Sequence, residues 1–203
     1  LCYLNSVGFH PCPKGLQKVK SFLPGKYIDP EGSMAFWTED YGLVTFTDGQ
    51  WFAGPHVAVD DHYQTGYFFK PLKSKKVAGG FQNDGVGIAS FPITPNTNWT
   101  FIDKTKGLEL DNVLTIAEDS SGKLWLGRYS QGLALYDPVL DTVRNWFRKG
   151  GGPDSIHFGT ISSIVDPEGR LWLGCHDGLR VIEDPSGFDF LKDNPAHAAK
   201  KIE

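Results

Sequence analysis

Cysteine is scarce in this chain of 203 residues, and long apolar runs are absent. The three cysteines, Cys2, Cys12 and Cys175, include no Cys-x-x-Cys pair, so their spacing does not indicate a zinc or redox motif. Cys2 and Cys12 either form a disulfide in an oxidising compartment or, like Cys175, remain buried thiols. No segment approaches the roughly 20 apolar residues of a membrane-spanning helix, so we expect no membrane insertion by this chain.

Positive charge is also sparse. The formal net charge is −4, and only around residues 73–76 does a basic run exceed two residues. Because nucleic-acid binding requires a basic face, no nucleic-acid partner is expected. We interpret residues 70–76 as a solvated turn. No pattern indicates a cofactor or a metal site, and none is predicted.

Turn residues and aromatic residues are, in contrast, abundant. The sequence contains 24 glycines, 13 prolines and six tryptophans, and 40 % of its residues are hydrophobic. Such a chain is long enough to bury a core without metals or disulfides. Frequent turns between short apolar runs are typical of all-β domains. We therefore expect an all-β fold.

A repeat of about 45 residues runs along the chain. Its best copies are Asp119-Ser-Ser-Gly-Lys-Leu-Trp-Leu-Gly127 and Asp166-Pro-Glu-Gly-Arg-Leu-Trp-Leu-Gly174, and each is followed by a further glycine-led apolar segment. An earlier copy begins at Asp29, and a degenerate one has Ala78 where tryptophan is expected. The glycines that we take to open the third segment of each copy are Gly42, Gly87, Gly132 and Gly178.

This periodicity predicts a β-propeller of four antiparallel four-stranded blades, either a small closed propeller or part of a larger one. The predicted blades cover residues 20–52, 66–103, 112–148 and 160–192. Residues 1–19 are a candidate closing strand beside the last blade, since its exposed edge needs a cover. Residues 193–203 form a C-terminal tail.

The conserved spacing within the repeat assigns roles to its key residues. Asp119 and Asp166 are expected to accept backbone hydrogen bonds in tight turns. Trp125 and Trp172 are expected to fill the space between neighbouring blades. An aromatic residue also recurs in the fourth strand, at Trp51, Trp99 and Trp146, with Phe188 or Phe190 in the last copy.

The segments 116–127 and 163–174, with Gly132-Leu-Ala-Leu-Tyr-Asp-Pro138 and Gly178-Leu179, resemble the two-component regulator propeller repeat. The resemblance is strong over 112–185, fair over 27–52 and weak over 66–103. In that family the repeats form periplasmic propellers of hybrid sensor kinases, often tuned to oligosaccharides, and related propellers include the streptogramin lyases. The resemblance implies a periplasmic or extracellular location, and the chain is either complete or part of a larger sensor protein.

The loops between second and third strands are the candidate binding site, because such loops gather at one end of a propeller channel. Their polar and aromatic side chains suit a small polar ligand or an oligosaccharide. The candidate residues are Asp40, Tyr41, Asn83, Asp84, Tyr129, Gln131, His176 and Asp177. The alternative for each is an ordinary turn residue, since Asp and Asn before glycine are favoured for backbone reasons.

The sequence is compatible with three functions. The leading hypothesis is a ligand-binding or sensing module. Under this hypothesis the chain is a binding protein and not an enzyme. The second is a small lyase or hydrolase with a cation-assisted histidine, supplied by His176 with Asp177 or by His62 with Asp60. The third is a scaffold for protein–protein interaction, with no small-molecule site.

Overall fold

The computed structural model describes residues 2–5, 8–11, 22–28, 34–38, 42–47, 50–53, 66–81, 85–91, 97–109, 112–128, 132–146 and 158–202. In this part of the chain the helical elements are a single 3-10 turn, η2 (Lys104–Lys106), and the one-turn helix α1 (Pro195–Ala198). Among the described residues, no helix is long and apolar enough to cross a membrane. Strands form nearly all the regular structure.

Four antiparallel sheets of four strands each follow one another along the chain. Their strands, in order, are β3 (Phe22–Ile28), β4 (Met34–Thr38), β5 (Gly42–Thr47) and β6 (Gln50–Ala53) in sheet 1; β7 (Gly66–Pro71), β8 (Lys76–Phe81), β9 (Gly85–Ser90) and β10 (Thr100–Ile102) in sheet 2; β11 (Val113–Glu118), β12 (Leu124–Arg128), β13 (Gly132–Asp137) and β14 (Thr142–Trp146) in sheet 3; and β15 (Thr160–Val165), β16 (Leu171–Cys175), β17 (Gly178–Ile182) and β18 (Lys200–Lys201) in sheet 4. The predicted all-β class and the four four-stranded sheets are confirmed.

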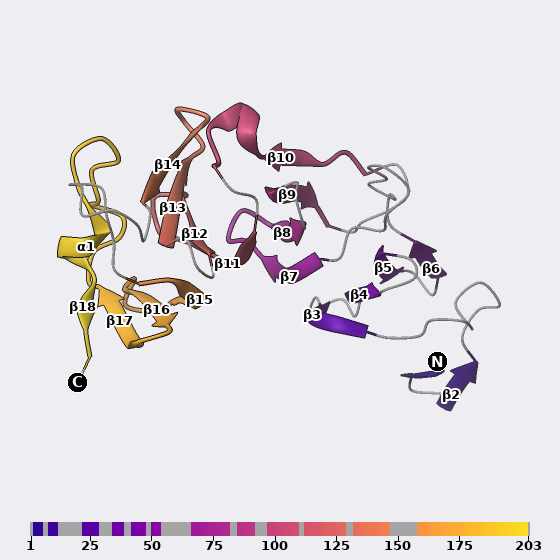
Figure 1. Ribbon diagram of the computed structural model, residues 1–203. Coiled ribbons are helices and arrows are strands. Elements are labelled where there is room, and N and C mark those ends of the chain that lie inside the picture. The colour runs from indigo at the N-terminus through magenta and orange to yellow at the C-terminus, as the bar shows by residue number, and fades with distance from the viewer. Residues whose placement is uncertain are drawn as a thin grey trace.

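The sheets lie in chain order along an open arc, and the two ends of the chain are far apart (Figure 1). The structure therefore does not show a closed ring. Strands β1 (Cys2–Asn5) and β2 (Gly8–Pro11) pair with each other in a separate two-stranded sheet. Within the described residues these two strands pair only with each other, and the pairing of residues 1–19 with the last sheet stays a prediction. The outer position beside β17 belongs to β18, from the C-terminal tail.

The second repeat opens its third strand at Gly85, and the prediction of Gly87 is wrong by two residues. Gly85 pairs with the last residue of β8, just as Gly132 pairs with the last residue of β12. Gly85 has a φ of 76° and Gly132 a φ of 95°, in the left-handed region that favours glycine. A Cβ at Gly85 would also clash with the carbonyl oxygen of Ile102. The backbone conformation thus identifies the equivalent residue where the spacing did not.

Sheets 2 and 3 each pack one face on the preceding sheet and the other on the following sheet, whereas sheet 1 contacts only sheet 2 and sheet 4 only sheet 3 through the apolar clusters of the described residues. We call these the front and back faces. Ala35 on the back of sheet 1 packs against Phe69 and Val77 on the front of sheet 2. The back of sheet 2 and the front of sheet 3 share a second apolar cluster, and the back of sheet 3 and the front of sheet 4 share a third. The core is thus three successive inter-sheet layers.

The repeated aspartate and tryptophan are directly bonded. Asp119, which is almost completely buried, accepts the backbone N–H groups of Ser121 and Lys123 through Oδ1 at 2.9 and 3.2 Å, which confirms its predicted turn role. Its second oxygen accepts the indole N–H of Trp125 at 2.9 Å. Asp166 repeats the arrangement with Trp172 at 2.7 Å. The sequence did not predict this indole bond.

The two tryptophans differ in burial. Trp125 is fully buried on the back of sheet 3, and its ring meets Phe188 edge-on at 5.0 Å between centroids. Trp172 lies on the back of sheet 4 and is only half-buried, with the guanidinium of Arg170 5.4 Å from its ring. The expectation that both are buried between blades is therefore correct for Trp125 and wrong for Trp172, since no described sheet follows sheet 4.

The last copy of the fourth-strand aromatic residue is also placed differently from the prediction. Phe188 and Phe190 are buried, but neither lies in a strand. Phe188 packs against Trp146 at 5.7 Å between ring centroids. The phenylalanines fill the layer between sheets 3 and 4, while β18 supplies the hydrogen-bonded edge.

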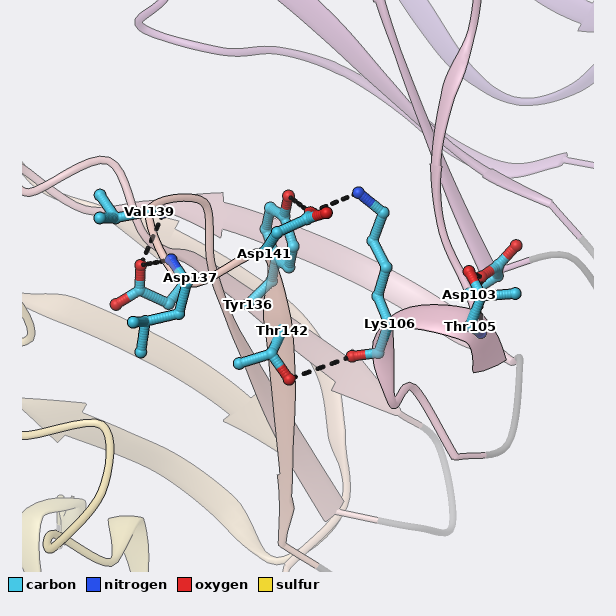
Figure 2. A network of polar contacts seen from close by, with 9 residues as sticks. Asp103, Thr105, Lys106, Tyr136, Asp137, Val139, Asp141 and Thr142 are labelled. Carbon is cyan, nitrogen blue, oxygen red and sulfur yellow. Dashed lines mark hydrogen bonds and ion pairs between the residues drawn. The ribbon is translucent and has the colours of Figure 1, made fainter.

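A polar network fastens the connection after β10 to β14, the outer strand of sheet 3 (Figure 2). Lys106 forms an ion pair with Asp141, whose carboxylate also accepts the hydroxyl of Tyr136 at 2.6 Å. The hydroxyl of Thr142 donates to the backbone carbonyl of Lys106 at 3.4 Å. Burial and the contact with Asp141 raise the pKa of Tyr136. The connection therefore lies over an edge strand that could otherwise pair with another chain.

We expect Trp125→Ala to lower the free energy of unfolding by about 3–5 kcal/mol, because a fully buried ring is lost and a cavity remains. Trp172→Ala is the matched control, because the indole of Trp172 donates to the equivalent aspartate, Asp166, and this substitution should cost less than half as much. Urea unfolding measures both. Equal losses for the two variants would contradict the difference in packing.

The acid stability of the chain should depend on Asp166. Desolvation raises the pKa of Asp166, but hydrogen bonds from Trp172 and Arg170 and the charge of Arg170 outweigh it and bring the pKa to about 2. Since this lies below the ordinary value of about 3.9, the carboxylate stabilises the fold above that value and loses its contribution as the pH falls toward 2.

Asp166→Asn should therefore make the decline of stability between about pH 4 and pH 2 shallower than in the wild-type chain. Glu168→Gln, in the same turn, is the control and should retain the wild-type decline. Thermal unfolding midpoints recorded across this pH range test the prediction. An unchanged slope in the Asp166 variant would contradict it.

Candidate functional site

The loops between second and third strands lie at the same end of each sheet. The closing pairs of the β4–β5, β8–β9, β12–β13 and β16–β17 ladders are Thr38 with Gly42, Phe81 with Gly85, Arg128 with Gly132, and Cys175 with Gly178. We call this the loop end of the sheets. Six candidate residues lie outside the described residues, namely Asp40, Tyr41, Asn83, Asp84, Tyr129 and Gln131. The structure describes His176 and Asp177.

His176 and Asp177 form the turn between β16 and β17, and both are exposed. The carboxylate of Asp177 accepts a hydrogen bond from Arg180 at 2.6 Å, and the ammonium of Lys201 lies 3.9 Å away. The hydrogen bond from Arg180 lowers the pKa of Asp177. Asp177 is therefore an ionised turn residue that ties β17 to β18, and its charge is already compensated.

Arg180 connects this turn to the interior. Its guanidinium lies 4.5 Å from the centroid of the Phe158 ring, a cation–π contact, and also donates to the carbonyl of Ala199 at 3.5 Å. Cys175, at the end of β16, is half-buried, and burial raises the pKa of its thiol. The thiol donates to the carbonyl of Leu173 at 3.6 Å. This cluster supports the turn that carries His176.

Arg128 occupies the corresponding position at the end of β12, directly before Tyr129. It is fully buried and donates to the backbone carbonyls of Leu133, at 3.3 Å, and Glu109. Burial lowers the pKa of Arg128 to about 10, although the charge of Glu109 opposes the shift. Sequence reasoning missed this residue. The signal for it is a charged side chain at a position that holds Thr38, Phe81 and Cys175 in the other repeats.

Lys70 lies among the first strands of three sheets. Its ammonium, on β7, donates to the hydroxyl of Thr115 at 3.3 Å, to the carbonyl of Ile116 at 3.1 Å and to the carbonyl of Ser163 at 2.6 Å. Thr115 and Ser163 are themselves joined through their hydroxyls at 2.9 Å. Burial lowers the pKa of Lys70. We call this group the lysine clasp.

The clasp corrects the interpretation of residues 70–76 as a solvated turn. Lys73, Lys75 and Lys76 are exposed as expected, whereas Lys70 is directed toward β11 and β15 and is partly buried. Lys70 is the fifth residue of β7, so the basic run extends into a strand. All three acceptors of its ammonium are uncharged groups.

The structure describes only part of the alternative, histidine-centred site. His62 and Asp60 lie outside the described residues, and the carboxylate of Asp177 is bonded to Arg180. Among the residues that the structure describes, no group of three or more His, Cys, Asp or Glu side chains could hold a metal ion. The described loop end thus offers a supported turn with one exposed histidine.

Comparison with solved structures supports the fold. The chain is similar to the extracellular domain of the hybrid two-component system protein BT4673 from B. thetaiotaomicron, with a TM-score of 0.58 and 18 % identity over 82 % of this chain and 21 % of that one. The chain is also similar to PorZ of Porphyromonas gingivalis, a surface component of the type-IX secretion system. The TM-score is 0.57 and the identity 14 %, over 83 % of this chain and 27 % of PorZ. For YCF48 from Cyanidioschyzon merolae the TM-score is 0.58 and the identity 14 %, over 83 % of this chain and 52 % of that one.

These similarities concern the fold alone, since every identity is below one fifth. The chain spans 21 % to 52 % of the lengths of the three structures. No protein-family model matches the sequence. No curated protein matches it either. The resemblance to the two-component regulator propeller repeat therefore stands on the motifs and on structural neighbours that include an extracellular domain of a two-component system.

The lysine clasp should contribute to stability. Lys70→Met keeps the length of the side chain but leaves the carbonyls of Ile116 and Ser163 without this donor, so we expect a loss of about 1–3 kcal/mol in urea unfolding. Lys75→Met, in the exposed turn of the same sheet, is the control and should change stability by less than about 0.5 kcal/mol. Equal behaviour of the two variants would show that the clasp is energetically silent.

Proposed function

We propose that the chain is a ligand-binding module of an extracytoplasmic sensor, in which the four sheets are blades of a propeller. Its ligand is a polar, glycan-like molecule bound by the loops at the loop end. The observation that carries the proposal is the equivalent position, at the loop end of four sheets whose first strands lie together, of the strand pairs that flank the four polar loops. Binding residues are characteristically held in this way, on loops supported by a regular scaffold.

The structural neighbours support the location. One of them is the extracellular domain of a two-component system protein and another is a bacterial surface component. We therefore place this module in the periplasm or outside the cell, as part of a larger sensor protein. Propeller-like folds carry many activities, so the ligand class is inferred from the loop chemistry and not from the fold.

The loop residues divide into ligand contacts and supports. Tyr41 and Tyr129 offer aromatic faces on which a sugar ring can stack, and Asn83 and Gln131 offer amides for its hydroxyl groups. His176 is the exposed donor of the fourth loop, whereas Asp177 is bonded to Arg180 and holds the loop. Asp40 and Asp84 complete the acceptor set.

Isothermal titration calorimetry tests this proposal. The probes are linear glucan, mannan and galacturonan oligosaccharides, titrated into the wild-type chain and into His176→Ala and Tyr129→Ala variants. We expect one glycan class to bind and each variant to weaken binding at least about tenfold, a change of about 1.4 kcal/mol. His197→Ala is the matched control, because His197 is also exposed but lies in α1, beyond the opposite end of β17.

Two results would contradict the proposal. One is the absence of binding to every glycan class by a chain whose unfolding is cooperative. The other is binding that His176→Ala and Tyr129→Ala leave unchanged, since the ligand would then bind away from the loop end.

A further inference from the structure

The lysine clasp holds a positive charge that has no negative partner among the described residues. The ammonium of Lys70 donates to the hydroxyl of Thr115 and to the backbone carbonyls of Ile116 and Ser163, and all three acceptors are neutral. A charge withdrawn from water is normally paired, because its desolvation is costly. The clasp therefore leaves one positive charge uncompensated between the first strands of three sheets.

Two carboxylates that follow Ile116 in the chain are bonded elsewhere. Glu118 accepts the backbone N–H of Lys73, in the turn between β7 and β8. Asp119 accepts the backbone of its own turn and an indole N–H. Burial lowers the pKa of Lys70, and no negative charge of the described residues opposes that shift. The ammonium is thus held in place by hydrogen bonds, and its charge remains unmatched.

The clasp lies close to the loop end. Thr115 pairs with Gly127, and the adjacent pair in this ladder is Val113 with Arg128, at the loop end of sheet 3. At about 3.3 Å per residue, two residues of a strand span about 7 Å. This is less than the screening length of about 8 Å at physiological ionic strength. Since Lys70 is also partly exposed, its charge acts on a ligand at the loop end.

The turn at the loop end of sheet 4 adds to the positive charge. Asp177 has two cationic partners there, since Arg180 donates to it at 2.6 Å and the ammonium of Lys201 lies 3.9 Å away. The candidate residues Asp40 and Asp84, whose charge is opposite, belong to the loops of sheets 1 and 2. A chain with a formal net charge of −4 therefore has an excess of positive charge beside this turn.

We propose that the ligand of the loop end is an acidic oligosaccharide, whose sugars carry carboxylates, and that the ammonium of Lys70 distinguishes it from a neutral one. The inference rests on the proposed glycan-binding function and names the class of glycan. A carboxylate at the loop end compensates the charge that the clasp leaves unmatched, whereas a neutral sugar does not. The protein interior screens this attraction less than water does. Because three acceptors already fix the ammonium, Lys70 acts through its electric field.

The test compares one oligosaccharide in two charge states. A short linear oligogalacturonate and its methyl ester have the same sugar rings, but only the first carries carboxylates. In isothermal titration calorimetry with the wild-type chain, we expect the acid form to bind at least about tenfold more tightly than the ester. Raising the ionic strength from about 0.1 M to about 1 M shortens the screening length from about 10 Å to about 3 Å, so this preference should largely disappear.

Substitution of the lysine identifies the charge responsible. For Lys70→Met the affinities of the acid form and the ester should agree within about twofold. Lys75→Met, in the exposed turn of the same sheet, is the matched control and should keep the wild-type preference. A purely structural loss would weaken both forms alike, so the ratio of the two affinities separates the charge of Lys70 from its role in stability. The ester comparison and the salt series use the wild-type chain and do not depend on the folding of any variant.

Three results would overturn the inference. The acid form and the ester could bind the wild-type chain equally, or Lys70→Met could keep the preference for the acid form. In both cases a glycan still binds, so the proposed function stands and only the role of the charge is wrong. The third result is tighter binding of an oligoglutamate peptide than of the oligogalacturonate, which would make the ligand an acidic peptide. Absence of binding by every glycan would overturn the proposed function together with this inference.

Discussion

The bond between a buried aspartate and the indole of the tryptophan six residues later is the interaction on which the architecture depends. A large ring is the best filler for the space between two sheets, but its N–H must find an acceptor once it is buried. The turn aspartate supplies that acceptor at Asp119, and its remaining oxygen is satisfied by the backbone of the turn. One side chain therefore fixes the hairpin between first and second strands and the position of Trp125 in the inter-sheet layer. The recurrence at Asp166 and Trp172 makes the device part of the repeat.

The structural features that could be predicted from the sequence are those that depend on residues close together in the chain. The Asp-x-x-Gly turn, the strand alternation and the repeat length each depend on a few neighbouring residues, and together they predicted the four sheets and the role of Asp119. The start of the third strand in the second repeat was predicted at the wrong glycine. Gly85 and Gly87 look alike in the sequence, and only the positive φ of Gly85 identifies it as the first residue of that strand. The burial of Trp172 was misjudged because burial depends on the sheet that follows, and this information is not contained in the motif around the tryptophan.

The candidate site shows the same division between local and distant information. Counting from the repeat was sufficient to place His176 and Asp177 in a turn at the end of a sheet. It could not reveal that Arg180 neutralises Asp177, or that Lys70 is bonded to residues up to 93 positions away. Such partners are set by how sheets stack, so they become visible only in three dimensions. The same reason explains why Arg128, buried at the end of β12, was not among the predicted residues.

The lysine clasp has a consequence for folding. A stack of similar units in which each touches only its neighbours can unfold from an end, one unit at a time, with little cooperativity. Lys70 connects sheet 2 to sheet 4 directly while also bonding to sheet 3, so the loss of the last sheet removes a bond from a unit two places away. Contacts that skip a neighbour in this way couple the melting of the units they join. The ammonium of Lys70 thus couples the unfolding of three sheets, where contacts between neighbours alone would couple two.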